Sequence, residues 1–130
     1  MIVTNEKCHI CGEIVDFVVD DKVVLLREAK CSNCKASIRN SDVAGEILNY
    51  IDELDGDLIS MAERLSGLNI LNACSSGHIH NVLKNLPNYT CCEYLDGIPS
   101  GEYDDGILCV DLCNIPFLAN TFDLVITEDV

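Results

Sequence analysis

The most regular pattern of hydrophobic and polar positions lies in the second half of the chain. Apolar residues run through 68–74, stop at small polar residues and Gly77, and then recur at helical spacing through 79–86. This pattern predicts a strand, a tight turn and a helix. We expect Ser75 or Ser76 to cap the helix, and Gly77 to let a ligand approach the backbone at the positive end of the helix dipole.

Three further apolar runs follow and predict buried strands over 89–94, 107–112 and 122–127. The stretch 95–106 between the first two is rich in Gly, Pro, Ser and Asp, which is typical of a loop. Strands that are apolar on both faces favour a parallel sheet covered on both sides. Residues 68–130 are therefore expected to form an α/β unit with a partial, Rossmann-like, mostly parallel sheet.

A helical connector is predicted over 41–67, ahead of that sheet. Its apolar residues recur at alternating threes and fours, with Ser41 as the candidate N-cap and Gly67 just beyond the end. The segment Asp55-Gly56-Asp57 lies in its middle, where a glycine costs about 1 kcal/mol relative to alanine. One long helix and two shorter helices are therefore competing interpretations.

The first forty residues contain two C-x-x-C pairs, separated by nineteen residues. Four thiolates at this spacing are typical of a tetrahedral Zn²⁺ site, with four buried reduced cysteines as the alternative. The alternating residues between the pairs predict a hairpin turning at Asp20-Asp21 and returning through 23–26. His9, inside the first pair, is expected to be a bystander. Residues 1–40 are therefore predicted to be a zinc ribbon, whose closed structural site would be made by Cys8, Cys11, Cys31 and Cys34.

Charge excludes some classes of partner. Twenty-two acidic and eight basic residues leave a formal charge of −14, which disfavours nucleic acid and anionic membranes. The N-terminus lacks the features of a signal peptide, and no apolar run approaches the roughly 20 residues that span a membrane. We expect a cytoplasmic protein whose nine cysteines are thiols or metal ligands.

Acidic residues follow the predicted strands. Glu93 comes sixteen residues after Gly77, where Rossmann-like sheets place a carboxylate on the ribose hydroxyls of an adenosyl ligand, although an exposed strand-end acid is the simpler alternative. Asp111-Leu112 follows the third strand. Glu128 and Asp129 follow the fourth strand, at the same expected edge of the sheet.

The succession C-E-Y-L-D-G, V-D-L-C-N-I-P-F and F-D-L-V-I-T-E-D-V resembles the "type 11" group of class I S-adenosylmethionine-dependent methyltransferases. The N-terminal segment is similar to zinc ribbons found ahead of some such domains. The resemblance implies methyl transfer with S-adenosylmethionine as the methyl donor, and it implies a structural Zn²⁺. No residue pattern identifies the methyl acceptor or the catalytic residues.

The resemblance also implies residue roles. Glu93 would bind the ribose, Asp111 would bind the adenine amino group with Leu112 nearby, and Glu128 would lie at the same edge. The methionine end of the cofactor would pass a turn made by Asn72, Ala73, Cys74, Ser75 and Gly77. The family turn is richer in glycine than this one.

The family sheet continues beyond the point that corresponds to Val130, so we expect a truncated and inactive fragment that self-associates through its last strand, 122–127. The alternative function is a non-enzymatic zinc-ribbon adaptor that binds a protein partner. His78 and His80, on the helix after the turn, are expected to be solvent-exposed. The cysteines outside the two pairs are expected to be small buried apolar groups.

Overall fold

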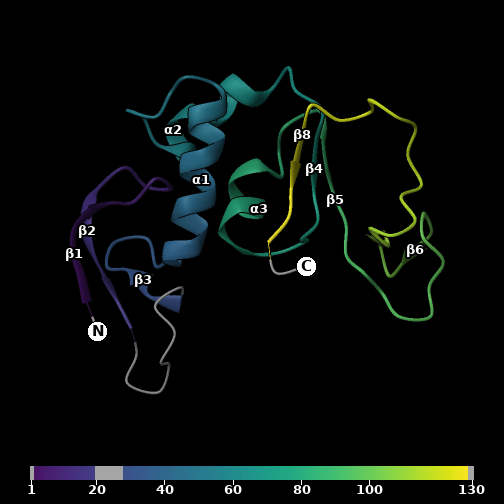
Figure 1. Ribbon diagram of the computed structural model, residues 1–130, viewed down its shortest axis with the longest axis horizontal. Coiled ribbons are helices and arrows are strands. Elements are labelled where there is room, and N and C mark those ends of the chain that lie inside the picture. The colour runs from purple at the N-terminus through teal and green to yellow at the C-terminus, as the bar shows by residue number, and fades with distance from the viewer. Residues whose placement is uncertain (1, 20–27, 129–130) are drawn as a thin grey trace. The chain divides into compact units, whose positions relative to one another are not determined.

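The computed structural model describes residues 2–19 and 28–128. The chain divides into two compact units, Met1–Leu65 and Ser66–Val130. Figure 1 shows that the first unit combines a small sheet with helices, and that the second combines a parallel sheet, a short helix and a hairpin. The chain is therefore a mixed α/β protein.

The sheet of the first unit has three antiparallel strands in the order β1-β2-β3. They are β1 (Ile2–Lys7), β2 (Ile14–Val18) and β3 (Lys30–Cys31). In β2 the buried residues Val15 and Phe17 alternate with exposed neighbours, as the sequence pattern predicts. Strand β1 was not predicted. The predicted turn at Asp20-Asp21 and the return through 23–26 lie outside the described residues.

The connector is not one long helix. It forms α1 (Ile38–Tyr50), α2 (Leu58–Met61) and the 3-10 helix η2 (Ala62–Leu65), so the interpretation with a break is correct. Helix α1 ends just before Asp52, whose φ of 57° is left-handed. The side chain of Asp57 then caps α2 by accepting a hydrogen bond from the Ser60 N–H at 2.9 Å.

The predicted start of α1 is wrong by one turn. Ser37 is the N-cap, and its hydroxyl accepts a hydrogen bond from the Asn40 N–H at 3.0 Å. Ser41 lies inside the helix and is buried, where its hydroxyl accepts a hydrogen bond from the His9 N–H at 3.0 Å. The serine expected to start the helix instead joins the helix to the first cysteine pair.

The sheet of the second unit has three parallel strands in the order β5-β4-β8. They are β4 (Ile70–Asn72), β5 (Tyr89–Cys91) and β8 (Leu124–Ile126), and α3 (Gly77–Leu83) follows β4. The parallel direction and the strand–turn–helix sequence agree with the predicted pattern. The strands are shorter than their apolar runs.

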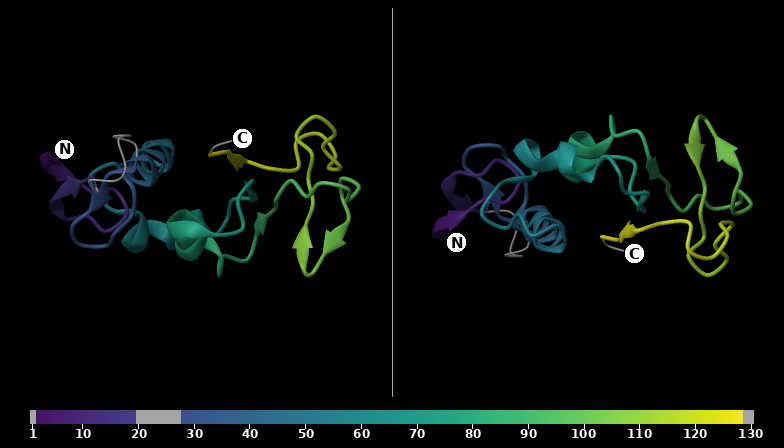
Figure 2. Two further views of the ribbon diagram at one scale, coloured as in Figure 1. Left: turned by 90° about the horizontal axis from the view of Figure 1, so that it is seen from below. Right: turned by 90° about the horizontal axis from the view of Figure 1, so that it is seen from above.

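The predicted third strand, 107–112, differs from the structure. Only β7 (Ile107–Leu108) is a strand, and it pairs in an antiparallel hairpin with β6 (Tyr103–Asp104), inside the segment expected to be a loop. Beyond the hairpin, a parallel bridge joins Cys109 to Glu93. Figure 2 shows the hairpin on the β5 side of the sheet, and the bridge explains this position.

One core cluster of the second unit lies on the face of its sheet that Leu71 occupies. Leu71 and Cys92 from that face pack with Leu108 and Val110, and the rings of Phe117 and Phe122 meet edge to face against this cluster, with centroids 4.9 Å apart. In α3, Ile79 and Leu83 are buried. The returning segment after β7 thus covers the sheet without forming a long strand of its own.

Candidate functional site

The two C-x-x-C pairs fold into turns of the same geometry. In each turn, the first cysteine accepts a backbone hydrogen bond from the residue four positions later and donates one to the carbonyl five positions later. These bonds are Gly12 N to Cys8 O, Lys35 N to Cys31 O, Cys8 N to Glu13 O and Cys31 N to Ala36 O, at 2.7, 3.0, 2.9 and 2.8 Å. Both turns therefore present their cysteine side chains in equivalent ways.

The fourth residue after the first cysteine is left-handed in each turn, with φ of 84° at Gly12 and 69° at Lys35. Gly12 is required for a second reason, because a Cβ there would lie 2.9 Å from a carboxylate oxygen of Asp57. Lys35 adopts a conformation that costs a non-glycine residue of the order of 1 kcal/mol or more. The turn keeps Lys35 in this strained conformation, and the same turn orients a cysteine side chain.

The four thiols converge. The sulfur atoms of Cys8, Cys11, Cys31 and Cys34 all lie within 4.8 Å of one another, with Cys8 Sγ 3.7 Å from Cys34 Sγ and Cys11 Sγ 3.9 Å from Cys31 Sγ. A tetrahedral Zn²⁺ with bonds of about 2.3 Å would separate its sulfur ligands by about 3.8 Å. The four cysteines therefore lie close enough to hold a metal ion.

Burial raises the pKa of the Cys8 thiol above its ordinary value, and burial also raises the pKa of Cys34. The cause is the loss of water around a thiolate. A cation at the centre of the cluster would compensate that loss, and the N–H groups of Asn33 and Cys34 already point at Cys31 Sγ from 3.4 Å. The cluster has the chemistry of a cation site with thiolate ligands.

Among the described residues, no other group of three or more His, Cys, Asp or Glu side chains lies close enough to hold a metal ion. His9 is not part of the cluster, as the sequence analysis expects of a bystander. Its ring packs on α1, where a Cβ added to Gly45 would lie 3.0 Å from the ring. Its Nδ1 is buried without a hydrogen-bond partner.

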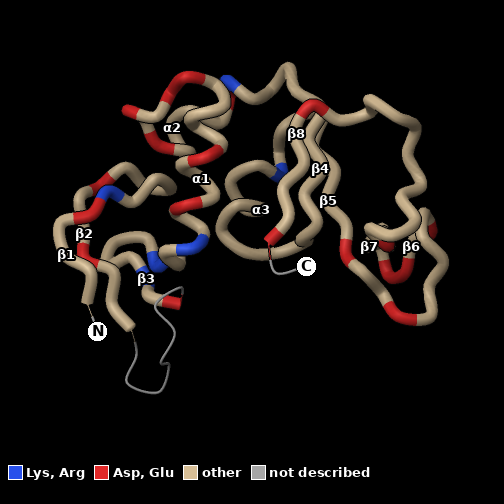
Figure 3. The backbone as a smooth tube through the Cα atoms, viewed as in Figure 1, with Lys and Arg blue, Asp and Glu red and all other residues tan. Residues whose placement is uncertain are grey.

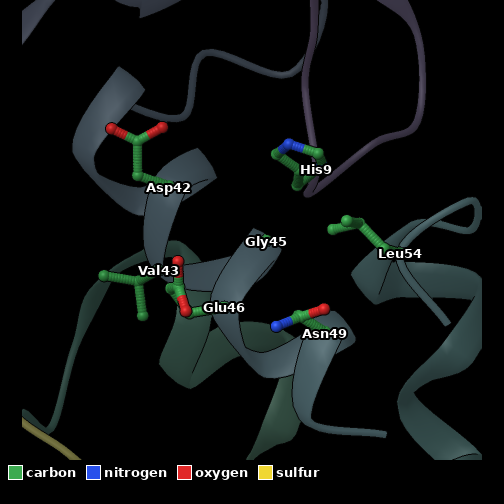
Figure 4. Close-up of a pocket in the computed structure, with 7 residues that line it drawn as sticks. All are labelled: His9, Asp42, Val43, Gly45, Glu46, Asn49 and Leu54. Atoms are coloured by element: carbon green, nitrogen blue, oxygen red, sulfur yellow. The ribbon is translucent and has the colours of Figure 1, made fainter. Parts of the chain in front are cut away.

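A pocket of about 590 Å³ lies beside His9. Figure 4 shows Asp42, Glu46 and Asn49 reaching it from α1, with His9 on the opposite side and Leu54 at one end. Asp42 and Glu46 are one helical turn apart, so both carboxylates belong to one helix face. The pocket is therefore polar and acidic on one wall.

In the second unit, the predicted cofactor residues follow the carboxyl ends of neighbouring parallel segments. Asn72 ends β4 and is paired in register with Cys91 of β5 and Ile126 of β8. Glu93 is two residues beyond Cys91, and Glu128 is two residues beyond Ile126. Both acids therefore come the same number of residues after a strand position that pairs with Asn72. Ala73 donates its N–H to the Ile126 carbonyl at 2.9 Å, which extends the pairing by one residue.

The turn after β4 binds Glu93 directly. Ser75 donates its N–H and its hydroxyl to Oε1 of Glu93, at 2.8 and 3.0 Å. Neither serine caps α3 with its side chain: Ser76 is the N-cap residue but makes no such bond. Cys74 donates its thiol to the Ser76 carbonyl, and Gly77 has a φ of 93° with open space within 4 Å of where a Cβ would stand.

Asp111 lies in a tight polar turn. Its N–H donates to the Ser100 hydroxyl at 3.0 Å, and its carboxylate accepts the Cys113 N–H at 2.9 Å. The next residue, Leu112, is 38% exposed. Asp111 is two residues beyond Cys109, which bridges to Glu93, so the two acids follow adjacent chain segments.

Sequence reasoning missed a hydrogen-bonded group on the same unit. Asn72 donates its side-chain N–H to the Tyr89 hydroxyl at 3.0 Å, and that hydroxyl lies 2.8 Å from Nδ1 of His80. His78 and His80 are both half-buried, so the expectation that they are exposed is wrong. The sequence offers one signal for this group, which is the place of His80 on α3, the helix that follows the turn.

Comparison with known proteins finds no matching family model, no similar curated protein and no similar solved structure. The methyltransferase resemblance therefore depends on the sequence motifs alone. Within residues 2–19 and 28–128, none of the helices has both the length and the apolar character needed to cross a membrane.

Proposed function

We propose that Cys8, Cys11, Cys31 and Cys34 bind one structural Zn²⁺. The observation that carries this proposal is the convergence of four thiols from two equivalent turns, with sulfur separations near those of a tetrahedral zinc site. Four protein ligands leave no open position for a substrate, so the ion would stabilise the first unit and take no part in chemistry.

The experiment is elemental analysis of protein purified without added metal, with one zinc per chain as the expected result. Chelation should then lower the melting temperature of the first unit, and added Zn²⁺ should restore it. Iron in place of zinc, or no metal with an unchanged melting curve after chelation, would exclude the assignment.

We further propose that the second unit binds S-adenosylmethionine and serves methyl transfer. The proposal rests on the motif resemblance. The parallel order β5-β4-β8 and the Glu93–Cys109 bridge support it, because Glu93 and Asp111 then lie on adjacent segments of the chain in the order that the motifs imply. The cofactor would supply an already activated methyl group. The residues of this chain would bind and orient it, with Glu93 on the ribose and Asp111 on the adenine.

The hydrogen bonds of Glu93 are compatible with this role. Ser75 occupies Oε1, and this contact would hold the carboxylate in one orientation while Oε2 accepts a ribose hydroxyl. The remaining turn residues, Asn72, Ala73, Cys74 and Gly77, would line the methionine end. Leu112 and Glu128 would lie beside the adenine and at the same sheet edge.

Titration calorimetry with S-adenosylhomocysteine tests cofactor binding. Glu93→Ala and Asp111→Ala should each weaken affinity by roughly 1.5–3 kcal/mol, the value of a charge-assisted hydrogen bond. Asp96→Ala is the matched control, because Asp96 is an exposed acid close to Glu93 in the chain. Equal affinity in all four proteins would remove the residue assignments.

The second candidate function is a non-enzymatic adaptor that binds a protein partner through the first unit. The acidic pocket favours it, because neither Asp42 nor Glu46 has an ion pair with a Lys or Arg among the described residues. A basic side chain of a partner would complement that wall. Absence of S-adenosylhomocysteine binding by the unmodified chain would favour the adaptor over the methyltransferase.

A further inference from the structure

A chain of hydrogen bonds runs from the interior of the second unit to its surface. Asn72 is 1% exposed and donates from Nδ2 to the Tyr89 hydroxyl, which in turn lies 2.8 Å from Nδ1 of His80. The rings of Tyr89 and His80 are tilted by 45° with centroids 5.7 Å apart. Three polar side chains from β4, β5 and α3 thus meet between a helix and a sheet.

The direction of the first bond favours one tautomer of the histidine. Because Asn72 donates to the Tyr89 oxygen, the single hydroxyl proton of Tyr89 is available for Nδ1 of His80. In that arrangement His80 accepts at Nδ1 and carries its own proton on Nε2. Burial, together with Lys84, lowers the pKa of His80, and burial raises the pKa of Tyr89 to about 12, so both groups are neutral near pH 7.

Such a network is costly in a helix–sheet interface. Oδ1 of Asn72 is buried without a hydrogen-bond partner, and an unpaired buried acceptor costs about 1–3 kcal/mol. An apolar residue at each of the three positions would avoid that cost. Polar networks that break the local packing rule are expected at functional positions.

His80 and Tyr89 line a pocket of about 440 Å³ between α3, β5 and the β6–β7 hairpin. This volume is within the range of about 300–1,000 Å³ found for small-molecule sites. No Asp, Glu, Lys or Arg among the described residues lines it. Its lining is Ser75, His80, Tyr89, Thr90, Cys91, Tyr103, Gly106, Ile107 and Leu108.

We propose that this pocket binds an uncharged, planar small molecule that carries a carbonyl group, such as an aromatic amide. The carbonyl oxygen accepts a hydrogen bond from Nε2–H of His80. The ring of the ligand packs against Tyr103, which is 69% exposed, and against Ile107 of the hairpin. Asn72 and Tyr89 are positioning residues, because they hold the imidazole in the tautomer that donates.

The negative charge of the second unit and the uncharged pocket lining favour a neutral ligand. The second unit has one basic residue, Lys84, and nine acidic residues, and Figure 3 shows the acidic positions of the described chain in red. An anion would be repelled by this field, and a cation would find no carboxylate in the pocket lining. Ser75 lines the pocket and also belongs to the turn proposed for the methionine end of the cofactor, whereas neither Glu93 nor Asp111 lines it. Benzamide binding and S-adenosylhomocysteine binding are therefore measured separately.

The test uses the 130-residue chain and three probes with the same ring: benzamide, benzoate and benzylamine. Binding is measured by NMR titration, with the ¹⁵N signals of the histidines as the site-specific readout. Benzamide should bind saturably, with a Kd on the order of 1 mM as its size allows, and should shift Nε2 of His80. Benzoate and benzylamine should bind at least about tenfold more weakly, because each brings an uncompensated charge.

Two variants and a matched control locate the site. His80→Phe keeps a ring and removes the hydrogen-bond donor, so it should weaken benzamide binding by about tenfold for a lost hydrogen bond. Tyr103→Ala shortens an exposed side chain without affecting the core, and it should also weaken benzamide binding. His78→Phe makes the same change on the same helix outside the pocket and should leave the affinity unchanged. Equal binding of the three probes, or unchanged benzamide affinity in both His80→Phe and Tyr103→Ala, would overturn the proposal.

Discussion

Ser75 and Glu93 are joined by two hydrogen bonds to one carboxylate oxygen, from the Ser75 N–H at 2.8 Å and from its hydroxyl at 3.0 Å. The contact fastens the turn after β4 to the residue that follows β5. The sequence pattern predicts that a serine in this turn caps α3. In the structure, Ser75 instead binds Glu93 at the neighbouring strand end, since the parallel register places Glu93 level with the turn.

Ser75→Ala should therefore destabilise the second unit. It removes the hydroxyl bond and leaves the backbone bond, so we expect a loss of about 1 kcal/mol in the free energy of unfolding, measured by urea denaturation. Ser76→Ala is the control, because the Ser76 side chain makes no capping bond. Equal stability of the two variants would show that the Ser75 hydroxyl contributes nothing to this contact.

Cys31→Ser should abolish the metal site. Cys31 is fully buried and its sulfur accepts hydrogen bonds from two backbone N–H groups, so loss of this ligand should cost several kcal/mol of the metal-dependent folding free energy. The measurements are bound zinc and the melting temperature. Cys113→Ser, which changes an exposed cysteine, should keep both. An unchanged melting curve for Cys31→Ser would remove the claim that the metal is structural.

Local patterns predicted much of the fold. The spacing of Cys8, Cys11, Cys31 and Cys34 is enough to anticipate their convergence, because two short turns of fixed geometry determine it. The parallel sheet and α3 follow from apolar runs and from Gly77. The hairpin β6–β7 has a sequence signal in Asp105-Gly106, whose φ values of 50° and 79° are those of a tight hairpin turn, although the composition of 95–106 as a whole predicts a loop.

Other features depend on tertiary contacts. Ser37 and Ser41 are both serines ahead of apolar residues. The bridge of Ser37 to Lys30 and the hydrogen bond from the His9 N–H to the Ser41 hydroxyl, both between segments distant in the sequence, accompany the start of the helix at Ser37. Strand β1 has little apolar alternation and forms because β2 offers it a partner. The contact between His80 and Tyr89 requires α3 to fold back over β5, which no spacing along the chain reveals.

Gly45→Ala should destabilise the first unit although alanine is the better helix former. The added Cβ would lie 3.0 Å from the His9 ring. The backbone of His9 is fixed by two hydrogen bonds, one from its N–H to the Ser41 hydroxyl and one from the Leu58 N–H to its carbonyl, so the ring has little room to move away. We expect the clash to outweigh the roughly 1 kcal/mol that alanine gains in helix propensity. Gly67→Ala is the control, with no atom within 4 Å of its added Cβ. A gain in melting temperature for Gly45→Ala would contradict the packing of His9 on α1.

Stability of the second unit should fall as the pH falls below about 6.5, the ordinary pKa of histidine. Burial and Lys84 lower the folded-state pKa of His80, so the unfolded chain takes up its proton first, and each step down in pH through this window favours unfolding. His80→Phe should reduce this pH dependence and His78→Phe should leave the His80 contribution in place. Urea denaturation between about pH 5 and 8 measures the free energy of unfolding against pH. An equal slope of this free energy in the unmodified and the His80→Phe proteins would refute the assignment.

Strand β8 should mediate self-association of the chain. It pairs only with β4 among the described strands, so its other edge presents unpaired backbone groups, and Val125 on it is 53% exposed. We expect concentration-dependent light scattering from the 130-residue chain. Val125→Lys places a charge on that edge and should suppress the association without affecting the core, whereas Ile59→Lys, a similarly exposed apolar position in α2 of the first unit, should not. A chain that stays monomeric at high concentration, or an association that Val125→Lys leaves unchanged, would show that β8 is not the associating edge.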